Sequence, residues 1–161
     1  MADAMLVGLT LGAALGCALV GGVFFAFSSF VMAALARLPP AHGIAAMQSI
    51  NRVVLTAWFM VPFFGTAIAC LILVVASLVG RGEPGAILRI IGGGLYVVGC
   101  IAVTIVRNVP RNDALAAVDP NSDAGAALWA SYVPGWTRWN TVRTVASLLA
   151  SVLLILALLT D

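Results

Sequence analysis

Polar and aromatic side chains that could act together on a ligand are concentrated between Arg107 and Arg143, in a chain that is otherwise largely hydrocarbon. Four of them follow the spacing i, i+3, i+4 and i+7, which places them on one face of a helix: Trp136, Trp139, Asn140 and Arg143. A guanidinium supplies a permanent charge, an amide supplies hydrogen bonds, and indoles supply flat surfaces for stacking. This combination indicates a site that binds and stabilises a flat anion.

More polar side chains adjoin the ends of other apolar segments: Gln48, Asn51 and Arg52 before the second, and Arg107 and Asn108 at the end of the third. Taken singly, each is explained by arginines that reach the membrane surface and by an interfacial belt of tryptophans. Taken together, they exceed what anchoring requires. We therefore expect the helix ends that carry Arg52, Arg107 and Arg143 to converge on one charged, flat-walled recess.

Other kinds of site find little support in the sequence. The chain has a single histidine, His42, and its apolar segments contain no carboxylate near their centres, so we expect no metal and no other cofactor. Cys17, Cys70 and Cys100 lie far apart inside apolar segments, which is typical of buried small side chains. The serines have no neighbouring base, and the spans have no acid of the kind that proton-coupled transporters use.

The composition is that of a membrane protein. Hydrophobic residues make up 63% of the chain, charged residues make up 9%, and the mean hydropathy is +1.13, against about 25% charged residues in soluble proteins. A net charge of +2 without a basic run argues against nucleic-acid binding.

Four apolar segments are long enough to cross a bilayer as helices: Met5–Ala34, Val53–Leu78, Ile87–Val106 and Thr141–Leu159. We predict an all-α, four-transmembrane-helix bundle formed by residues 1–161 as one domain in the lipid bilayer.

Two connections on one side of this bundle carry structure of their own. Leu38-Pro39-Pro40 ends the first helix, and the sequence from His42 to Leu55 predicts a short amphipathic segment in loop 1. Loop 3, at Asn112–Gly135, is longer, polar and aromatic, with an expected short interfacial helix at residues 124–132. We expect Pro110 to break or bend the third helix.

The distribution of arginines predicts the orientation. The side of loops 1 and 3 holds six of them, and the other side holds two: Arg37, Arg52, Arg107, Arg111, Arg138 and Arg143, against Arg81 and Arg89. The positive-inside rule then places loops 1 and 3 in the cytoplasm and both termini outside, in what we take to be a bacterial cytoplasmic membrane. The sequence carries no signal for an oligomeric state.

Four separated blocks of the chain are similar to a known family: GGVFFAFSSFVMAALARLP, GIAAMQSINRVV, RNVPRNDALAAV and WTRWNTVRTVAS. In this order, they resemble the DUF1772 family of small membrane proteins, which includes the anthrone oxygenase-like proteins. The positions that match the family pattern are Met47, Gln48, Asn51, Asn108, Pro110, Asn112, Trp139, Asn140 and Arg143. The chain departs from the pattern at Ala33, Arg111 and Thr141, where proline, an apolar residue and histidine are common in relatives. If that histidine accepts a proton in relatives, this chain lacks the acceptor.

The resemblance implies a four-helix membrane protein that oxygenates an anthrone-like polycyclic phenol without metal or flavin. On this basis Arg143, Arg107 and Asn140 are the candidate catalytic residues, and the candidate substrate-binding residues are Gln48, Asn51, Arg52, Asn108, Trp136 and Trp139. The alternative is a non-enzymatic membrane protein, either an accessory subunit or a binder of lipid, quinone or another hydrophobic or aromatic small molecule. Both readings use the same pocket.

Overall fold

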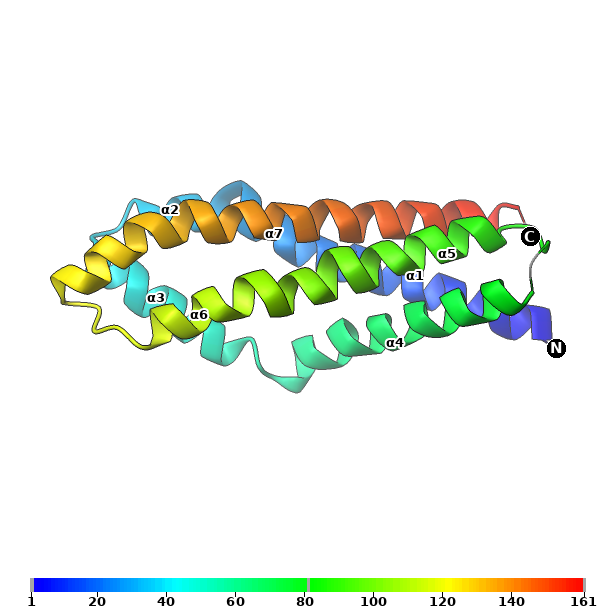
Figure 1. Ribbon diagram of the computed structural model, residues 1–161, viewed down its shortest axis with the longest axis horizontal. Helices are drawn as coiled ribbons and strands as arrows, with labels where there is room; N and C mark the ends of the chain where they lie inside the picture. Colours follow the sequence, from blue (N-terminus) through cyan, green and yellow to red (C-terminus); the bar gives the residue numbers. More distant parts are fainter. Residues whose placement is uncertain (1, 81, 161) are drawn as a thin grey trace.

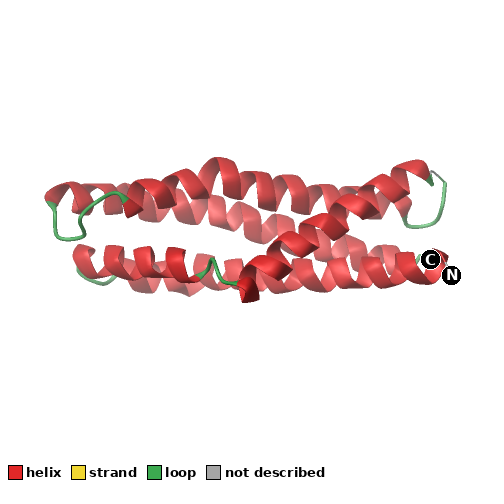
Figure 2. Cartoon of the chain, turned by 90° about the horizontal axis from the view of Figure 1, so that it is seen from below, coloured by secondary structure: helices red, strands yellow, loops and turns green. Residues whose placement is uncertain are grey.

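The computed structural model describes residues 2–80 and 82–160, and in these residues it contains helices and short connections but no strand (Figures 1 and 2). Four helical segments are long and apolar enough to cross a membrane: Ala4–Ala36, Ala57–Val79, Ala86–Ala116 and Asp123–Leu158. The predicted four-helix membrane architecture is confirmed. The elements are α1 (Ala2–Ala26), η1 (Phe27–Val31), α2 (Met32–Ala36), α3 (Pro40–Val53), α4 (Ala57–Val79), α5 (Ala86–Gly94), η2 (Leu95–Ala102), η3 (Thr104–Asn108), α6 (Val109–Ala116) and α7 (Asp123–Leu158).

Both chain ends lie at one end of the elongated bundle, beside the turn between α4 and α5 (Figure 1). The opposite end is formed by α2, α3, α6 and the first part of α7, and we call these four segments the head. This arrangement follows from an even number of spans. The orientation of the bundle in its membrane stays a prediction, and Arg81, which entered the sequence argument, lies outside the described residues.

The amphipathic segment predicted in loop 1 is the helix α3. Pro39 has extended geometry, with φ −48° and ψ 139°, and Pro40 occupies the first turn of the helix, where its missing amide proton costs nothing. Gly43 lies on the buried face, and a Cβ there would be 2.9 Å from both the Leu35 carbonyl oxygen and Trp129 Cζ2. The glycine therefore lets α3 pack closely against α2 and α7.

Loop 3 is shorter than the sequence suggested, because α7 is one continuous helix of 36 residues. Ser122 caps its start by accepting a hydrogen bond from the Gly125 amide at 3.0 Å. The expected separate helix at residues 124–132 is therefore the first part of α7. Pro134 lies inside this helix and removes only one backbone hydrogen bond. At 1.5 Å per residue α7 is about 54 Å long, so it projects beyond about 30 Å of hydrocarbon.

Pro110 was expected to break or bend the third helix, and it does not break it. The backbone widens into π-helical turns at η2 and η3, and the Val109 amide bonds to the Thr104 carbonyl, five residues back. Pro110 then falls in the first turn of α6, a position that tolerates proline. The π-helical turn accommodates Pro110 without ending the helix, which continues to Ala116.

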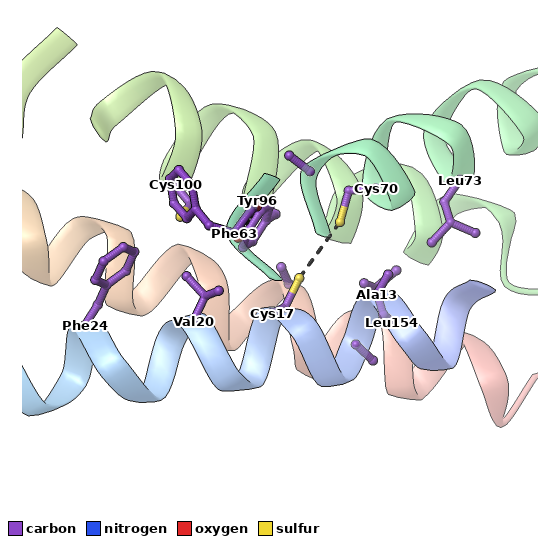
Figure 3. Close-up of a cluster of buried hydrophobic side chains, with 13 residues drawn as sticks. Ala13, Cys17, Val20, Phe24, Phe63, Cys70, Leu73, Tyr96, Cys100 and Leu154 are labelled. Atoms are coloured by element: carbon purple, nitrogen blue, oxygen red, sulfur yellow. Dashed lines mark hydrogen bonds between the residues drawn. The ribbon is translucent and has the colours of Figure 1, made fainter. Parts of the chain in front are cut away.

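Two buried clusters hold the bundle together. The spanning core lies among the four long helices (Figure 3), and the head core lies among α2, α3, α6 and α7. Cys17 and Cys70 face each other in the spanning core with 3.9 Å between sulfurs, and all three cysteines are free and buried, as predicted. The head core consists of Met32, Ile44, Met47, Leu115, Trp129, Tyr132 and Trp136.

The close packing of α5 on α4 gives a test of this bundle. A Cβ at Gly93 would be 2.8 Å from both the Cys70 carbonyl oxygen and Val74 Cγ2, whereas a Cβ at Gly94 meets nothing within 4 Å. We expect Gly93→Ala to lower the free energy of unfolding by about 1–3 kcal/mol, because overpacking forces the helices apart. Gly94→Ala is the matched control and should leave stability unchanged or slightly raised. Unfolding in detergent micelles measures both, and equal stability of the two variants would contradict the packing described.

Candidate functional site

A cavity of about 130 Å³ lies where the spanning core meets the head core. Phe24 and Phe63 contribute its wall from the spanning core, and Met47 and Trp136 contribute from the head core. An apolar cavity of about this size holds one benzene ring. The junction therefore offers a space with the size and surface of an aromatic ring.

Arg143, on α7, lines this cavity and is only 5% exposed. Its terminal nitrogens donate to Thr104 Oγ1 at 3.1 Å and to Asn140 Oδ1 at 2.7 Å, while its Nε has no hydrogen-bond partner. Within residues 2–80 and 82–160, no carboxylate pairs with this guanidinium. Burial of a charge is costly unless an opposite charge accompanies it. The cavity is therefore complementary to an anion.

Aromatic rings partly compensate for the missing anion. The guanidinium carbon of Arg143 lies 4.0 Å from the ring centroid of Phe24 and 5.3 Å from that of Trp136. The negative face of an aromatic ring attracts a cation most strongly where water is excluded. These contacts hold the charge in place, and Nε stays buried without a hydrogen-bond partner.

Asn140 supports Arg143 from behind. Its amide nitrogen donates to the Phe24 carbonyl at 2.7 Å and to Ser28 Oγ at 2.7 Å, while its oxygen accepts from Arg143. These contacts join α7 to the end of α1 and to the π-helical turn η1, where the backbone ladder shifts from i+4 to i+5. Asn140 is fully buried, so its part is to orient the arginine.

Asn112 holds the aromatic wall, a role that the sequence analysis did not assign to it. Its Oδ1 accepts from Tyr132 OH at 2.9 Å and from Trp136 Nε1 at 2.8 Å. Asn108 adds a hydrogen bond of 3.3 Å to the Trp136 carbonyl. The signal for Asn112 was present, because it follows Asn108 by four residues within one family block.

The wide turns explain which residues of the third helix face inward. Residues at a strict four-residue spacing point toward the bundle: Tyr96, Cys100, Thr104, Asn108 and Asn112. In an α-helix, with 3.6 residues per turn, side chains spaced four residues apart turn progressively away from the bundle interior. A π-helical turn contains more residues, so side chains at this spacing stay on the face that points inward. The sequence analysis did not anticipate these wide turns and expected Arg107 to reach the site.

Among the predicted site residues, Asn51, Trp136 and Arg143 line the cavity. The Nδ2 of Asn51 is buried and lacks an acceptor, as does the Nε of Arg143. Both N–H groups belong to residues that line the cavity, but the two nitrogen atoms are themselves fully buried. Asn140 and Asn108 lie directly behind these lining residues.

Three other predicted residues serve the structure elsewhere. Gln48 donates from Nε2 to the carbonyls of Leu115 at 2.9 Å and Val118 at 3.1 Å, and so caps the end of α6. Arg52 is exposed on α3. Arg107 is exposed as well, with its guanidinium carbon 4.6 Å from the ring centroid of Trp139. The recess formed by three arginines is thus corrected to a cavity with one.

The chemistry open to this site is anion binding and charge stabilisation. No group of three or more His, Cys, Asp or Glu side chains among the described residues could hold a metal ion. His42 is exposed on α3 and does not line the cavity. A planar ligand with an anionic oxygen satisfies both the aromatic wall and the unpartnered donors.

The hydrogen bonds of Asn112 can be tested by a double-mutant cycle. We expect Asn112→Leu to lower the free energy of unfolding by about 1–3 kcal/mol, since Tyr132 OH and Trp136 Nε1 lose their acceptor. Tyr132→Phe should cost less in the Asn112→Leu background than in the natural protein, because its hydroxyl is then already unsatisfied. Unfolding in micelles gives the coupling energy, and a value of zero would contradict the shared acceptor.

Comparison with known proteins places the chain in a family. The family model for anthrone oxygenase matches residues 58–153, more than half of the chain. This region contains α5, α6, nearly all of α4 and most of α7, including Arg143, Asn140 and Asn112. Neither the curated proteins nor the solved structures contain a match. The chain belongs to the anthrone oxygenase family.

Proposed function

We propose that this protein oxygenates an anthrone-like polycyclic phenol at the cavity between its two cores. The observation that carries the proposal is the buried guanidinium of Arg143, which faces an aromatic-lined space without a carboxylate partner in the described residues. An anthrone becomes a flat, delocalised oxyanion when its CH₂ group loses a proton. That anion fits the charge and the surface of the cavity.

The reaction needs little from the protein beyond binding and charge stabilisation. The anthrone anion transfers electron density to O₂, a C–O bond forms at the former CH₂ carbon, and the resulting hydroperoxide loses water to leave a quinone carbonyl. One oxygen atom of O₂ is retained in the quinone, and the other leaves in water with the two hydrogens of the CH₂ group. A preorganised donor in a site of low dielectric stabilises the charge that starts this sequence.

The cavity residues divide this work among them. Arg143 pairs with the oxyanion, Asn51 donates a second hydrogen bond, and Asn140 holds the guanidinium in position. Trp136 lies against one ring of the ligand, fixed there by Asn112. Gln48 and Asn108 then contribute through hydrogen bonds that hold the surrounding helices, and Arg52, Arg107 and Trp139 lie outside the cavity lining.

The cavity lining offers no basic side chain to accept the anthrone proton. No carboxylate or histidine is among the residues that line the cavity. Thr141, at the position where relatives often carry histidine, has its hydroxyl 3.0 Å from both Ser28 Oγ and the Thr137 carbonyl. We propose that Arg143 lowers the pKa of the bound anthrone enough for the proton to leave to water.

The same pocket could bind a flat amphiphile without turning it over, and the lack of a basic side chain in its lining favours this second function. The two functions differ in one measurement, the consumption of O₂ by purified protein on addition of an anthrone. Binding without O₂ uptake above the rate without protein would identify the protein as a binder.

We also propose that the head faces the cytoplasm of a bacterial cell. Arg37, Arg52, Arg107 and Arg138 are exposed at or near this end, and cytoplasmic ends of membrane proteins are enriched in arginine.

The charge of Arg143 is tested by its removal. We expect Arg143→Gln to lower kcat/KM for anthrone oxygenation by about 10²–10³, the loss typical of an oxyanion donor. Arg138→Gln is the matched control, because Arg138 is exposed and does not line the cavity. Arg107→Gln should resemble the control, since its guanidinium also lies outside the cavity. An O₂ electrode gives the rates, and full activity of Arg143→Gln would refute the proposed site.

The pH dependence of ligand binding tests the same charge without turnover. With 1,8-dihydroxyanthraquinone as a stable probe, we expect the phenol to have a pKa about one unit or more lower when bound than when free, equivalent to about 1.4 kcal/mol per unit. A cation beside the oxygen favours the phenolate, so affinity rises with pH between the bound and the free pKa and is constant above the free value. Absorbance titration follows the phenolate. Arg143→Gln should abolish the shift, and an unshifted pKa with the natural protein would contradict the pairing.

A further inference from the structure

The cavity opens sideways, at the short connection between α3 and α4. Val54, Leu55 and Met60 form its edge on this side, and Val109 of α6 lies in the same lining. Leu55 is 69% exposed and Val109 is 41% exposed. Figure 2 shows this connection near the middle of the length of the molecule. The mouth is therefore apolar and lies on the flank of the bundle.

The head closes the end of the cavity that lies toward water. Met47, Tyr132 and Trp136 belong to the head core, together with Leu115, and each of these side chains is at most 5% exposed. Hydrogen bonds from Gln48 and to Asn112 tie α3, α6 and α7 together across this region. A ligand that approached through the head would have to separate packed helices.

The level of the mouth in the membrane follows from α4. This helix has 23 residues, a length of about 35 Å, and this matches the hydrocarbon thickness of a bilayer. Its first residues, next to Leu55, therefore lie at the membrane boundary. Trp58 is 93% exposed at this level, which is typical of an interfacial tryptophan. The apolar mouth therefore lies at this boundary and faces lipid.

We propose that the ligand enters from the bilayer through this mouth, with its anionic oxygen first. The charged side chain of the lining, Arg143, marks where the oxygen end stops. A cavity of about 130 Å³ holds about one ring, so the rest of a polycyclic ligand stays between Leu55, Met60 and Val109 or in the lipid. This inference rests on the ligand site of the proposed function and adds the route and the direction of binding.

The proposal also names the class of ligand. A phenol that partitions into the membrane, with its apolar part opposite the acidic oxygen, can bind without leaving the bilayer completely. A hydrocarbon extension on that apolar part is tolerated because it remains in lipid. An ionised group at the same position is excluded, because charge is costly in hydrocarbon.

A kinetic experiment tests the route. The protein is placed in phosphatidylcholine vesicles that contain 1,8-dihydroxyanthraquinone, and binding is followed by stopped-flow absorbance. We expect Leu55→Trp and Val109→Trp to slow association by about tenfold, because the larger side chain narrows the mouth. Ile68→Trp is the matched control: Ile68 is also exposed on α4, at 58%, but it does not line the cavity. Unchanged association in both mouth variants, or equal slowing in the control, would overturn the route.

Thiol labelling tests the direction without an effect on packing. Cys17, Cys70 and Cys100 are all fully buried, so a cysteine introduced at the surface reacts over a low background. At probe concentrations ten times its Kd, we expect the bound ligand to slow labelling of Leu55→Cys by N-ethylmaleimide about tenfold. Labelling of Ile68→Cys should not change. Equal labelling of Leu55→Cys with and without the probe would show that the ligand does not occupy the mouth.

These outcomes separate the route from the proposed oxygenation. Slow probe entry in the mouth variants together with no anthrone-dependent O₂ uptake would retain the lateral route and reject the oxygenase. O₂ uptake by the natural protein together with normal probe entry in both mouth variants would retain the oxygenase and reject the lateral route.

Discussion

The buried charge of Arg143 is the constraint on which the rest of this structure depends. A guanidinium that is 5% exposed and has no carboxylate partner in the described residues must be stabilised by other means. Thr104 and Asn140 accept two of its hydrogen bonds, and the faces of Phe24 and Trp136 flank its charge. These contacts offset only part of the free-energy cost of burying the Arg143 charge. An anionic ligand would complete the compensation, which is the physical basis of the proposed function.

The support for this arginine comes from helices whose backbones are not regular. The π-helical turns η1 and η3 lie beside Asn140 and Thr104, and wide turns of this kind are frequent at functional sites. At η1 the Ser28 hydroxyl accepts a hydrogen bond from the Asn140 amide, and at η3 the wider turn brings Asn108 inward and leaves Arg107 outside. Local backbone geometry thus selects which polar side chains reach the cavity.

The head gives the bundle a second core at the end opposite the chain termini. Asn112 fixes Tyr132 and Trp136 at its base, and Gln48 ties α3 to the end of α6. Because the spanning core packs independently below, the space between the two cores is not filled by either. The cavity is a consequence of this two-part packing, and its side opening is a consequence of the break between α3 and α4.

The sequence by itself determined the four spanning helices, the helix in loop 1 and the family, because hydropathy and short motifs are local properties. It also identified Asn51, Trp136 and Arg143, which lie in the cavity. Only the tertiary structure decided that Gln48 caps a helix, that Arg52 and Arg107 face outward, and that Asn112 orders the aromatic wall. The physical reason is that side-chain direction depends on the turn width of the backbone and on partners more than sixty residues away, as for Gln48 and Leu115. Neither can be read from helical spacing alone.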